Sequence, residues 1–230
     1  FGLCTPTPTT IIHKQMPTEL HYYGAQGRAQ QIRYTMAEGG LEWDDACAPF
    51  PPPDDVKAKW LELGKNTTTN VPMLVMDGRA YTQSSAVLRL VARKGGLMPS
   101  DTEQQYEVDN VLGAVEDYRT EAYTVIFGVL GGAPDAAKLA RLKDVILPQH
   151  FKNLERLLGD DDYFVANTLS VADLGAFDII TNFSFNLFPS AKADFPKLVA
   201  FAARVAARPK MAAYLESEKY TALMPFPKLE

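Results

Sequence analysis

Between Asn70 and Leu90 the chain combines a proline, a tight turn and a polar helix start, and these residue types could hold a small acid. Val71-Pro72 opens a short apolar run, where a proline cannot donate to a sheet and a cis bond would need a structural reason. Asp77-Gly78 is a strong hairpin signal. Gln83-Ser84 then begins a helical pattern, and the unpaired N–H groups and dipole at such a start favour an anion. Together they predict a site for a small peptide-like acid.

This arrangement resembles the glutathione-binding half of the cytosolic glutathione transferases, in which a Val-Pro-x-Leu strand entry and a Gln-Ser helix start hold the tripeptide. The corresponding residues here are Val71-Pro72-Met73-Leu74 and Gln83-Ser84. Two further segments, Val115–Arg119 and the helix-capping stretch Ala166–Asp173, are similar to segments of the same family, which usually has Gly where Ala166 stands. The resemblance spans Glu19 to Glu218 and is greatest to the tyrosine-type classes, sigma and pi above all.

The resemblance implies chemistry on the glutathione thiol, whose reactive form is the thiolate. A free thiol has a pKa of about 8.5, and a hydroxyl that donates a hydrogen bond to the sulfur lowers it. Tyr22 stands five residues before Gly27, where the family places this donor, although a strand tyrosine can equally pack in the core. Tyr23 is the rival if the register shifts by one, and Arg28 is expected to orient the Tyr22 hydroxyl.

The other expected contacts follow from the groups that glutathione presents. Val71, next to a cis Pro72, would pair its backbone with the cysteinyl part as an added strand does. Ser84 suits the γ-glutamyl carboxylate at a helix N-terminus, with Gln83 hydrogen-bonding beside it. Asp117 would meet the γ-glutamyl ammonium from a neighbouring subunit, which implies a homodimer with twofold symmetry. An ordinary solvated charge on a helix face is an equal alternative for Asp117.

The glycine carboxylate of glutathione is expected to meet a Trp and a Lys, for which Trp60 and Lys65 are the candidates. Their spacing is one residue longer than in sigma-type relatives, so Lys57 or Lys59 could serve instead. For each lysine, an ordinary solvent-facing position is an alternative.

Two halves with different patterns must position these residues. From 18 to 97 the order is strand (Leu20–Tyr23), helix (27–38), strand (41–48), short helix (56–63), hairpin (72–76 and 80–82) and helix, which predicts an α/β, thioredoxin-like domain. From 98 to 230 strands are absent and helical patterns cover 102–130, 136–158, 171–188, 195–207 and 209–219, which predicts an all-α domain. Residues 1–17, rich in Thr and Pro, are expected to form a disordered tail.

Composition excludes several classes of function. A net charge of −5 argues against nucleic acid as the main partner, and no apolar stretch approaches the roughly 20 residues of a membrane-spanning helix. The only two cysteines, Cys4 and Cys47, form no CxxC pair and suggest free thiols in a reducing compartment, so a cytoplasmic location is expected, or an organelle after cleavage of a targeting peptide. No spacing of His, Cys or acids indicates a metal, and glutathione is the only co-substrate expected.

The expected activity is conjugation of the glutathione thiolate to hydrophobic electrophiles. The electrophile pocket should lie between the halves, lined by Tyr23, the residues after Gly24 and the segment Tyr118–Tyr123. Two alternatives are a glutathione-transferase-fold subunit with a structural or scaffold role, and a glutathione-dependent isomerase of prostaglandin-type lipids that uses the same site.

Overall fold

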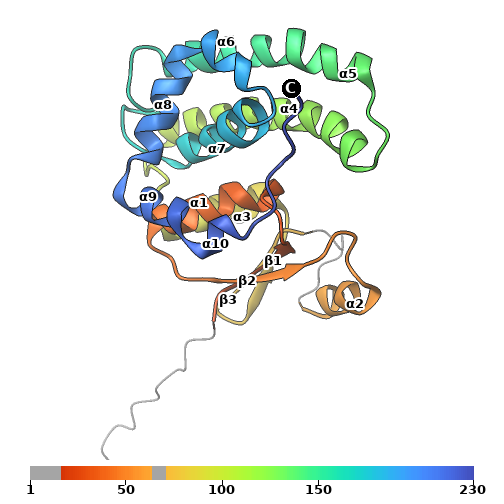
Figure 1. Ribbon diagram of the computed structural model, residues 1–230. Coiled ribbons are helices and arrows are strands. Elements are labelled where there is room, and N and C mark those ends of the chain that lie inside the picture. The colour runs from red at the N-terminus through yellow and green to blue at the C-terminus, as the bar shows by residue number, and fades with distance from the viewer. Residues whose placement is uncertain (1–16, 64–70) are drawn as a thin grey trace, which may run out of the picture.

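The computed structural model describes residues 17–63 and 71–230 and contains a four-stranded sheet beside a larger group of helices (Figure 1). The strands are β1 (Glu19–Tyr23), β2 (Asp44–Ala48), β3 (Met73–Met76) and β4 (Arg79–Tyr81). Their order in the sheet is β2-β1-β3-β4. β1 is parallel to β2 and antiparallel to β3, which pairs antiparallel with β4. The predicted fold class, a thioredoxin-like half followed by a helical half, is confirmed.

The hairpin and the second strand show how local chemistry sets the ends of the strands. Asp77 and Gly78 have φ values of 52° and 73°, as a two-residue turn of type I′ requires, so the predicted hairpin is confirmed. The second strand begins at Asp44, three residues later than predicted from Leu41. The reason is that Gly40, at φ 68°, and the Leu41 N–H, which donates to the Met36 carbonyl, close the preceding helix.

Three helices belong to the sheet half: α1 (Gln30–Gly39), α2 (Asp54–Glu62) and α3 (Ser84–Lys94). A short 3-10 turn, Gly27–Ala29, leads into α1. α1 and α3 lie between the sheet and the helical half (Figure 1). They approach closely because Gly39 faces Gly95: a Cβ at Gly39 would lie 2.9 Å from the Gly95 Cα. α2 instead packs Trp60 against Ala48 and Met73.

The helical half begins with the long helix α4 and continues to the chain's last helix. Its helices are α4 (Thr102–Leu130), α5 (Ala136–Arg141), α6 (Leu147–Leu158), α7 (Val171–Ile180), α8 (Pro196–Ala206), α9 (Pro209–Glu216) and α10 (Glu218–Thr221). The bounds predicted for α4 are confirmed.

Three of the predicted helices are interrupted in the structure. The stretch 136–158 contains a π-helical turn at Leu142–Ile146, because Pro148 has no N–H to donate to the Asp144 carbonyl of a regular α-helix. The stretch 171–188 changes to a π-helical turn at Thr181–Phe185. The stretch 209–219 breaks at Ser217, whose ψ of 155° is extended.

Helix α7 is the centre of the helical half, since every one of its residues is buried. Its predicted capping box is confirmed: Ser170 accepts from the Ala172 N–H at 3.2 Å, and Asp173 accepts from the Ser170 N–H at 2.8 Å. Asp173 also accepts from the Phe164 N–H at 2.9 Å, and burial raises the pKa of its carboxyl to about 6. Ala166, where the family resemblance expects Gly, has a φ of 50°, a conformation that Gly adopts most easily.

Some sequence-based expectations lie outside the described residues. These are the tail up to residue 16, Cys4 and Lys65. Cys47, in contrast, lies on β2 and is a free thiol. In the described ranges no helix is long and apolar enough to cross a membrane, and no group of three or more His, Cys, Asp or Glu is placed to hold a metal ion.

Candidate functional site

Tyr22 lies near the end of β1 and turns its hydroxyl toward the start of the first helix. Its side chain is 7% exposed, and the hydroxyl oxygen accepts a hydrogen bond from the Arg28 backbone N–H at 3.1 Å. Burial raises the pKa of Tyr22 above its ordinary value near 10, and the Arg28 hydrogen bond opposes that rise only in part. The hydroxyl therefore keeps its proton at neutral pH and can donate a hydrogen bond to an anion.

Gly27 makes this approach possible. Its φ is +43°, and a Cβ built on it would lie 2.5 Å from the Tyr22 hydroxyl oxygen. Any larger residue would displace the tyrosine ring and would also strain the backbone. The requirement for glycine at this position is thus both conformational and steric.

Arg28 acts on Tyr22 through its backbone, while its side chain turns elsewhere. The guanidinium forms an ion pair with Glu116 of α4 and lies 5.0 Å from the centroid of the Tyr123 ring. The expectation that Arg28 orients the Tyr22 hydroxyl thus has a geometric basis in the main-chain N–H. The side chain adds positive charge beside the same region.

Four of the predicted site residues, Arg28, Val71, Gln83 and Ser84, line a cavity of about 420 Å³. Its walls are formed by Arg28, Val71, Gln83, Ser84, Ser85 and Glu116. The Val71-Pro72 bond is cis, as expected. Ser84 and Ser85 are the first residues of α3, so their backbone N–H groups have no partner within the helix and can receive an anion.

Gln83 adopts an unusual backbone conformation at this cavity. Its φ of 71° and ψ of 106° place a non-glycine residue in a sparsely populated region, while its carbonyl accepts from the Ala86 and Val87 N–H groups. Such strain costs about 1–3 kcal/mol and concentrates at functional sites. This strained conformation supports a binding role for Gln83, because a turn that served only to connect β4 and α3 could use an unstrained backbone.

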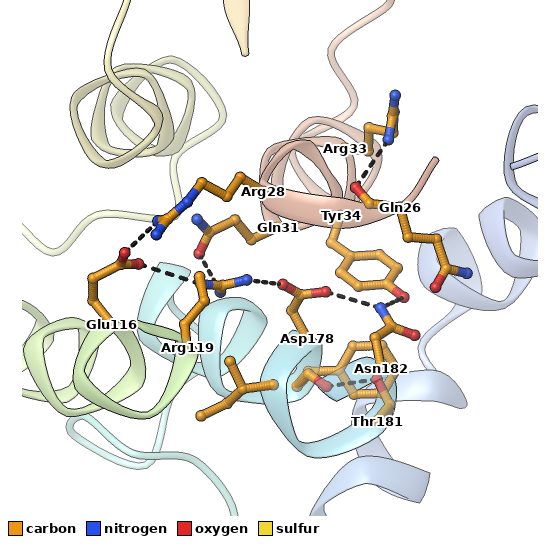
Figure 2. Close-up of polar contacts among 12 residues, drawn as sticks. Gln26, Arg28, Gln31, Arg33, Tyr34, Glu116, Arg119, Asp178, Thr181 and Asn182 are labelled. Atoms are coloured by element: carbon orange, nitrogen blue, oxygen red, sulfur yellow. Dashed lines mark hydrogen bonds and ion pairs between the residues drawn. The ribbon is translucent and has the colours of Figure 1, made fainter. Parts of the chain in front are cut away.

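Glu116 also lines this cavity, and no role was predicted for it from the sequence. Figure 2 shows it between Arg28 and Arg119, at the end of a polar chain that continues through Asp178. Arg119 and Asp178 are both fully buried and are joined at 2.7 Å, and Arg119 also donates to Gln31 of α1 at 3.0 Å. In the sequence, this network is indicated by two charged residues, Arg119 and Asp178, at positions that otherwise follow an apolar helical pattern.

A second, apolar pocket is lined by Gly27, whereas Arg28 lines the polar cavity. The lining residues of the apolar pocket are Tyr22, Tyr23, Ala25, Gly27, Phe50, Tyr123, Phe127, Leu130, Met224, Pro225 and Phe226. Tyr23, the residues after Gly24 and Tyr123, all expected at the electrophile pocket, line this apolar pocket. Tyr118, expected there as well, does not line it: its side chain is fully buried, and its hydroxyl donates a hydrogen bond to the Phe183 carbonyl at 3.0 Å. The C-terminal segment 224–226 was not predicted here, because no local pattern indicates where a chain end packs.

Four residues considered for glutathione binding do not line the 420 Å³ cavity. Trp60 is 4% exposed and packs near Tyr23 and Val71 in the small core under α2. Lys57 is exposed and pairs with Asp54 at 2.9 Å, and Lys59 is exposed as well. Asp117 is exposed on α4 beside Glu116, so its expected role from a second subunit stays a prediction.

Comparison with known proteins establishes the family. Residues 116–218 match the family model for the glutathione S-transferase C-terminal domain. Glutathione S-transferase A2 of Bos taurus is 30% identical to this chain over 202 residues, which cover 86% of this chain and 87% of the relative. The chain belongs to the glutathione S-transferase family.

Relatives within this family come from several classes. Glutathione S-transferase P of Bos taurus is 29% identical, with 89% of this chain and 94% of the relative covered. The structure of NaGST-2 superimposes with a TM-score of 0.75 at 24% identity, and it covers 88% of this chain and 97% of that protein. Rat hPGDS in complex with a quinoline gives a TM-score of 0.72 at 22% identity. The two structural likenesses show the shared fold, which here brings Tyr22 and the α3 N-terminus to neighbouring cavities.

Proposed function

We propose that this glutathione S-transferase joins the thiolate of glutathione to apolar electrophiles and that Tyr22 stabilises the thiolate. The observation that carries the proposal is the position of the Tyr22 hydroxyl, which is buried and accepts the Arg28 N–H at 3.1 Å. Tyr22 lines an apolar pocket, and Arg28, whose N–H it accepts, lines the polar cavity at the start of α3. We also propose that the enzyme is of the tyrosine type and closest to the sigma and pi classes.

The chemistry follows from the hydrogen bonds that Tyr22 can make. Its oxygen accepts from Arg28, which polarises the O–H bond and makes the hydroxyl a better donor. Donation to the sulfur favours the thiolate and lowers the thiol pKa, so that more of the nucleophile is present at neutral pH. The thiolate then forms a bond to carbon of the electrophile, and the electrophile's leaving group departs with the bonding electron pair. Tyr22 keeps its own proton throughout.

Glutathione would lie along the polar cavity. Ser84 and the N-terminus of α3 would receive the γ-glutamyl carboxylate, and Val71 would pair with the cysteinyl backbone. Glu116 has both carboxylate oxygens engaged, one by Arg28 and one by Arg119. We propose that the γ-glutamyl ammonium meets Asp117 of a second copy, which would complete the site in a homodimer.

The test compares the wild type with Tyr22→Phe and uses Tyr23→Phe as the matched control. The ultraviolet absorbance of bound thiolate is followed against pH, together with kcat/KM for an activated aromatic chloride. We expect Tyr22→Phe to raise the thiol pKa and to lower kcat/KM, and Tyr23→Phe to leave the thiol pKa unchanged. Equal thiol pKa values in the wild type and Tyr22→Phe would remove Tyr22 from the mechanism.

The alternatives are separated by binding and product analysis. A scaffold protein would give no heat with millimolar glutathione in isothermal titration. An isomerase of prostaglandin-type lipids would turn over its substrate without consuming glutathione, whereas conjugation consumes one thiol for each product. The likeness to rat hPGDS, at 22% identity, concerns the fold alone.

A further inference from the structure

We propose that Tyr123 is a positioning residue, whose hydroxyl donates a hydrogen bond to the Tyr22 oxygen and makes Tyr22 a stronger donor to the thiolate. This inference deepens the proposed function and rests on it. Tyr123 lies in α4 and lines the same apolar pocket as Tyr22, which lies in β1. The two hydroxyl-bearing rings therefore come from different halves of the fold and face one pocket.

The Tyr123 hydroxyl is buried and makes no hydrogen bond. The side chain is 8% exposed, and its oxygen has no hydrogen-bond partner among the described residues. Most buried tyrosine hydroxyls in proteins do have a partner. A hydroxyl in this position is destabilising unless it gains a partner when the site is in use.

Aromatic packing fixes the position of this hydroxyl. The Tyr123 ring stacks on Phe127 with 5.0 Å between the ring centroids and an interplanar angle of 16°. The edges of Phe183 and Phe226 meet it at centroid distances of 5.2 and 6.2 Å. The Arg28 guanidinium lies 5.0 Å from the centroid of the same ring. The ring is therefore held by four neighbours, and its hydroxyl cannot turn away to solvent.

The charged groups nearest to Tyr123 are already paired. Arg28, Arg119 and Asp178 all act electrostatically on its hydroxyl. Arg28 pairs with a carboxylate of α4, and Arg119 pairs with one Asp178 oxygen at 2.7 Å. The other Asp178 oxygen accepts from Asn182 at 2.8 Å. Both oxygens of this buried carboxylate are therefore engaged elsewhere.

The Tyr22 oxygen is the acceptor that suits Tyr123. A phenol oxygen has two lone pairs, and the Arg28 N–H uses one of them at 3.1 Å. The two hydroxyls form no hydrogen bond in this structure, yet they are close enough for Tyr123 to lower the pKa of Tyr22. Hydrogen bonds between catalytic groups are often long until substrate fills the site, and then tighten. A bond from Tyr123 leaves the Tyr22 proton for the sulfur.

The expected size of the effect follows from the hydrogen-bond chain that runs from Tyr123 through Tyr22 to the thiolate. Each bond in such a chain strengthens the next by about 10–30%. Because the bond from Tyr22 lowers the thiol pKa by about 1–2 units, loss of the Tyr123 hydroxyl should raise that pKa by about 0.2–0.6 unit. At a pH below the thiol pKa, kcat/KM should then fall about 1.5- to 4-fold.

The test compares the wild type with Tyr123→Phe, Tyr22→Phe and the double variant. The ultraviolet absorbance of bound thiolate is followed against pH, and kcat/KM is measured for an activated aromatic chloride and for an α,β-unsaturated ketone. We expect Tyr123→Phe to raise the thiol pKa and to lower kcat/KM by the same factor for both electrophiles. Added to Tyr22→Phe, it should change neither quantity, because it acts through Tyr22.

Tyr118→Phe is the matched control, since it also removes a buried hydroxyl from α4, one that is hydrogen-bonded and does not line the pocket. It should lower the stability in urea denaturation and leave the thiol pKa unchanged. Tyr123→Phe removes an unpaired hydroxyl and should be at least as stable as the wild type.

Three results would overturn the inference. They are an unchanged thiol pKa in Tyr123→Phe, a further rise when Tyr123→Phe is added to Tyr22→Phe, and a loss of kcat/KM confined to the ketone. The second would mean that Tyr123 contacts the sulfur directly, and the third that it contacts the electrophile. If Tyr22→Phe itself leaves the thiol pKa unchanged, the proposed function fails as well; if it raises that pKa and Tyr123→Phe does not, only this inference fails.

Discussion

Gly27→Ala should impair the reaction by moving the Tyr22 hydroxyl. The new Cβ would lie 2.5 Å from the hydroxyl oxygen and 2.8 Å from the Cε1 atom of the same ring, so the ring must shift away from the Arg28 N–H. Loss of one hydrogen bond to a charged group is worth about 1.5–3 kcal/mol, which equals about 1–2 pKa units at 1.4 kcal/mol per unit. We expect the pKa of bound glutathione to rise by about this amount, and kcat/KM below that pKa to fall about 10- to 100-fold.

A matched control separates this effect from backbone strain. Gly96 also has a positive φ, +69°, but a Cβ there would meet nothing within 4 Å. Gly96→Ala should therefore lose about 1–2 kcal/mol of unfolding free energy, as Gly27→Ala also should, without any change in the thiol pKa. The measurements are urea denaturation and the ultraviolet titration of bound thiolate. If Gly27→Ala remains folded and keeps the wild-type thiol pKa, the steric argument for Gly27 is wrong.

Three further outcomes are expected. Asp178→Leu should lower the free energy of unfolding by about 3–5 kcal/mol in urea denaturation, because it leaves the buried Arg119 without its ion-pair partner. Adding Arg119→Met should restore most of that loss. If the effects of the two substitutions simply add in the double variant, the two residues are not coupled. Gln83→Gly should stabilise the fold by up to about 1 kcal/mol while weakening glutathione binding in calorimetry, and unchanged affinity would exclude a binding role for the strained residue. Because burial raises the pKa of Tyr22 above 10, kcat/KM should rise once with pH, along the thiol ionisation, and stay level up to pH 10; a fall between pH 8 and 10 would show that the tyrosine loses its proton in that range.

Local patterns explain why so much of the fold was predictable. The Asp77-Gly78 turn needs two residues at positive φ, and Ser170 with Asp173 forms a capping box from residues three apart. These interactions are closed within a few residues, so the sequence alone encodes them. The π-helical turns were missed because the apolar period continues through them, even though Pro148 removes one hydrogen bond.

The candidate site was predictable where its residues belong to one short segment with a recognisable pattern. Val71, Gln83 and Ser84 lie within a short segment, and the fold places all three on one cavity. Glu116 and the Arg119–Asp178 pair were missed because their partners come from other helices, far away in the sequence. A buried charge is strongly destabilising unless it is paired with an opposite charge, and a sequence pattern does not show which residue is that partner.

By itself, the sequence determined that an α/β half is followed by a helical half, that a hairpin turns at Asp77-Gly78 and that a helix starts at Ser84. It also placed Tyr22 at the end of a strand shortly before Gly27. Only the tertiary structure decided that the Arg28 N–H reaches the Tyr22 hydroxyl and that the C-terminal segment 224–226 lines the pocket beside Tyr22. The physical reason is the distance along the chain between the interacting residues. Turns and caps depend on hydrogen bonds between neighbours in the chain, whereas the site depends on side chains and main-chain groups that packing brings together.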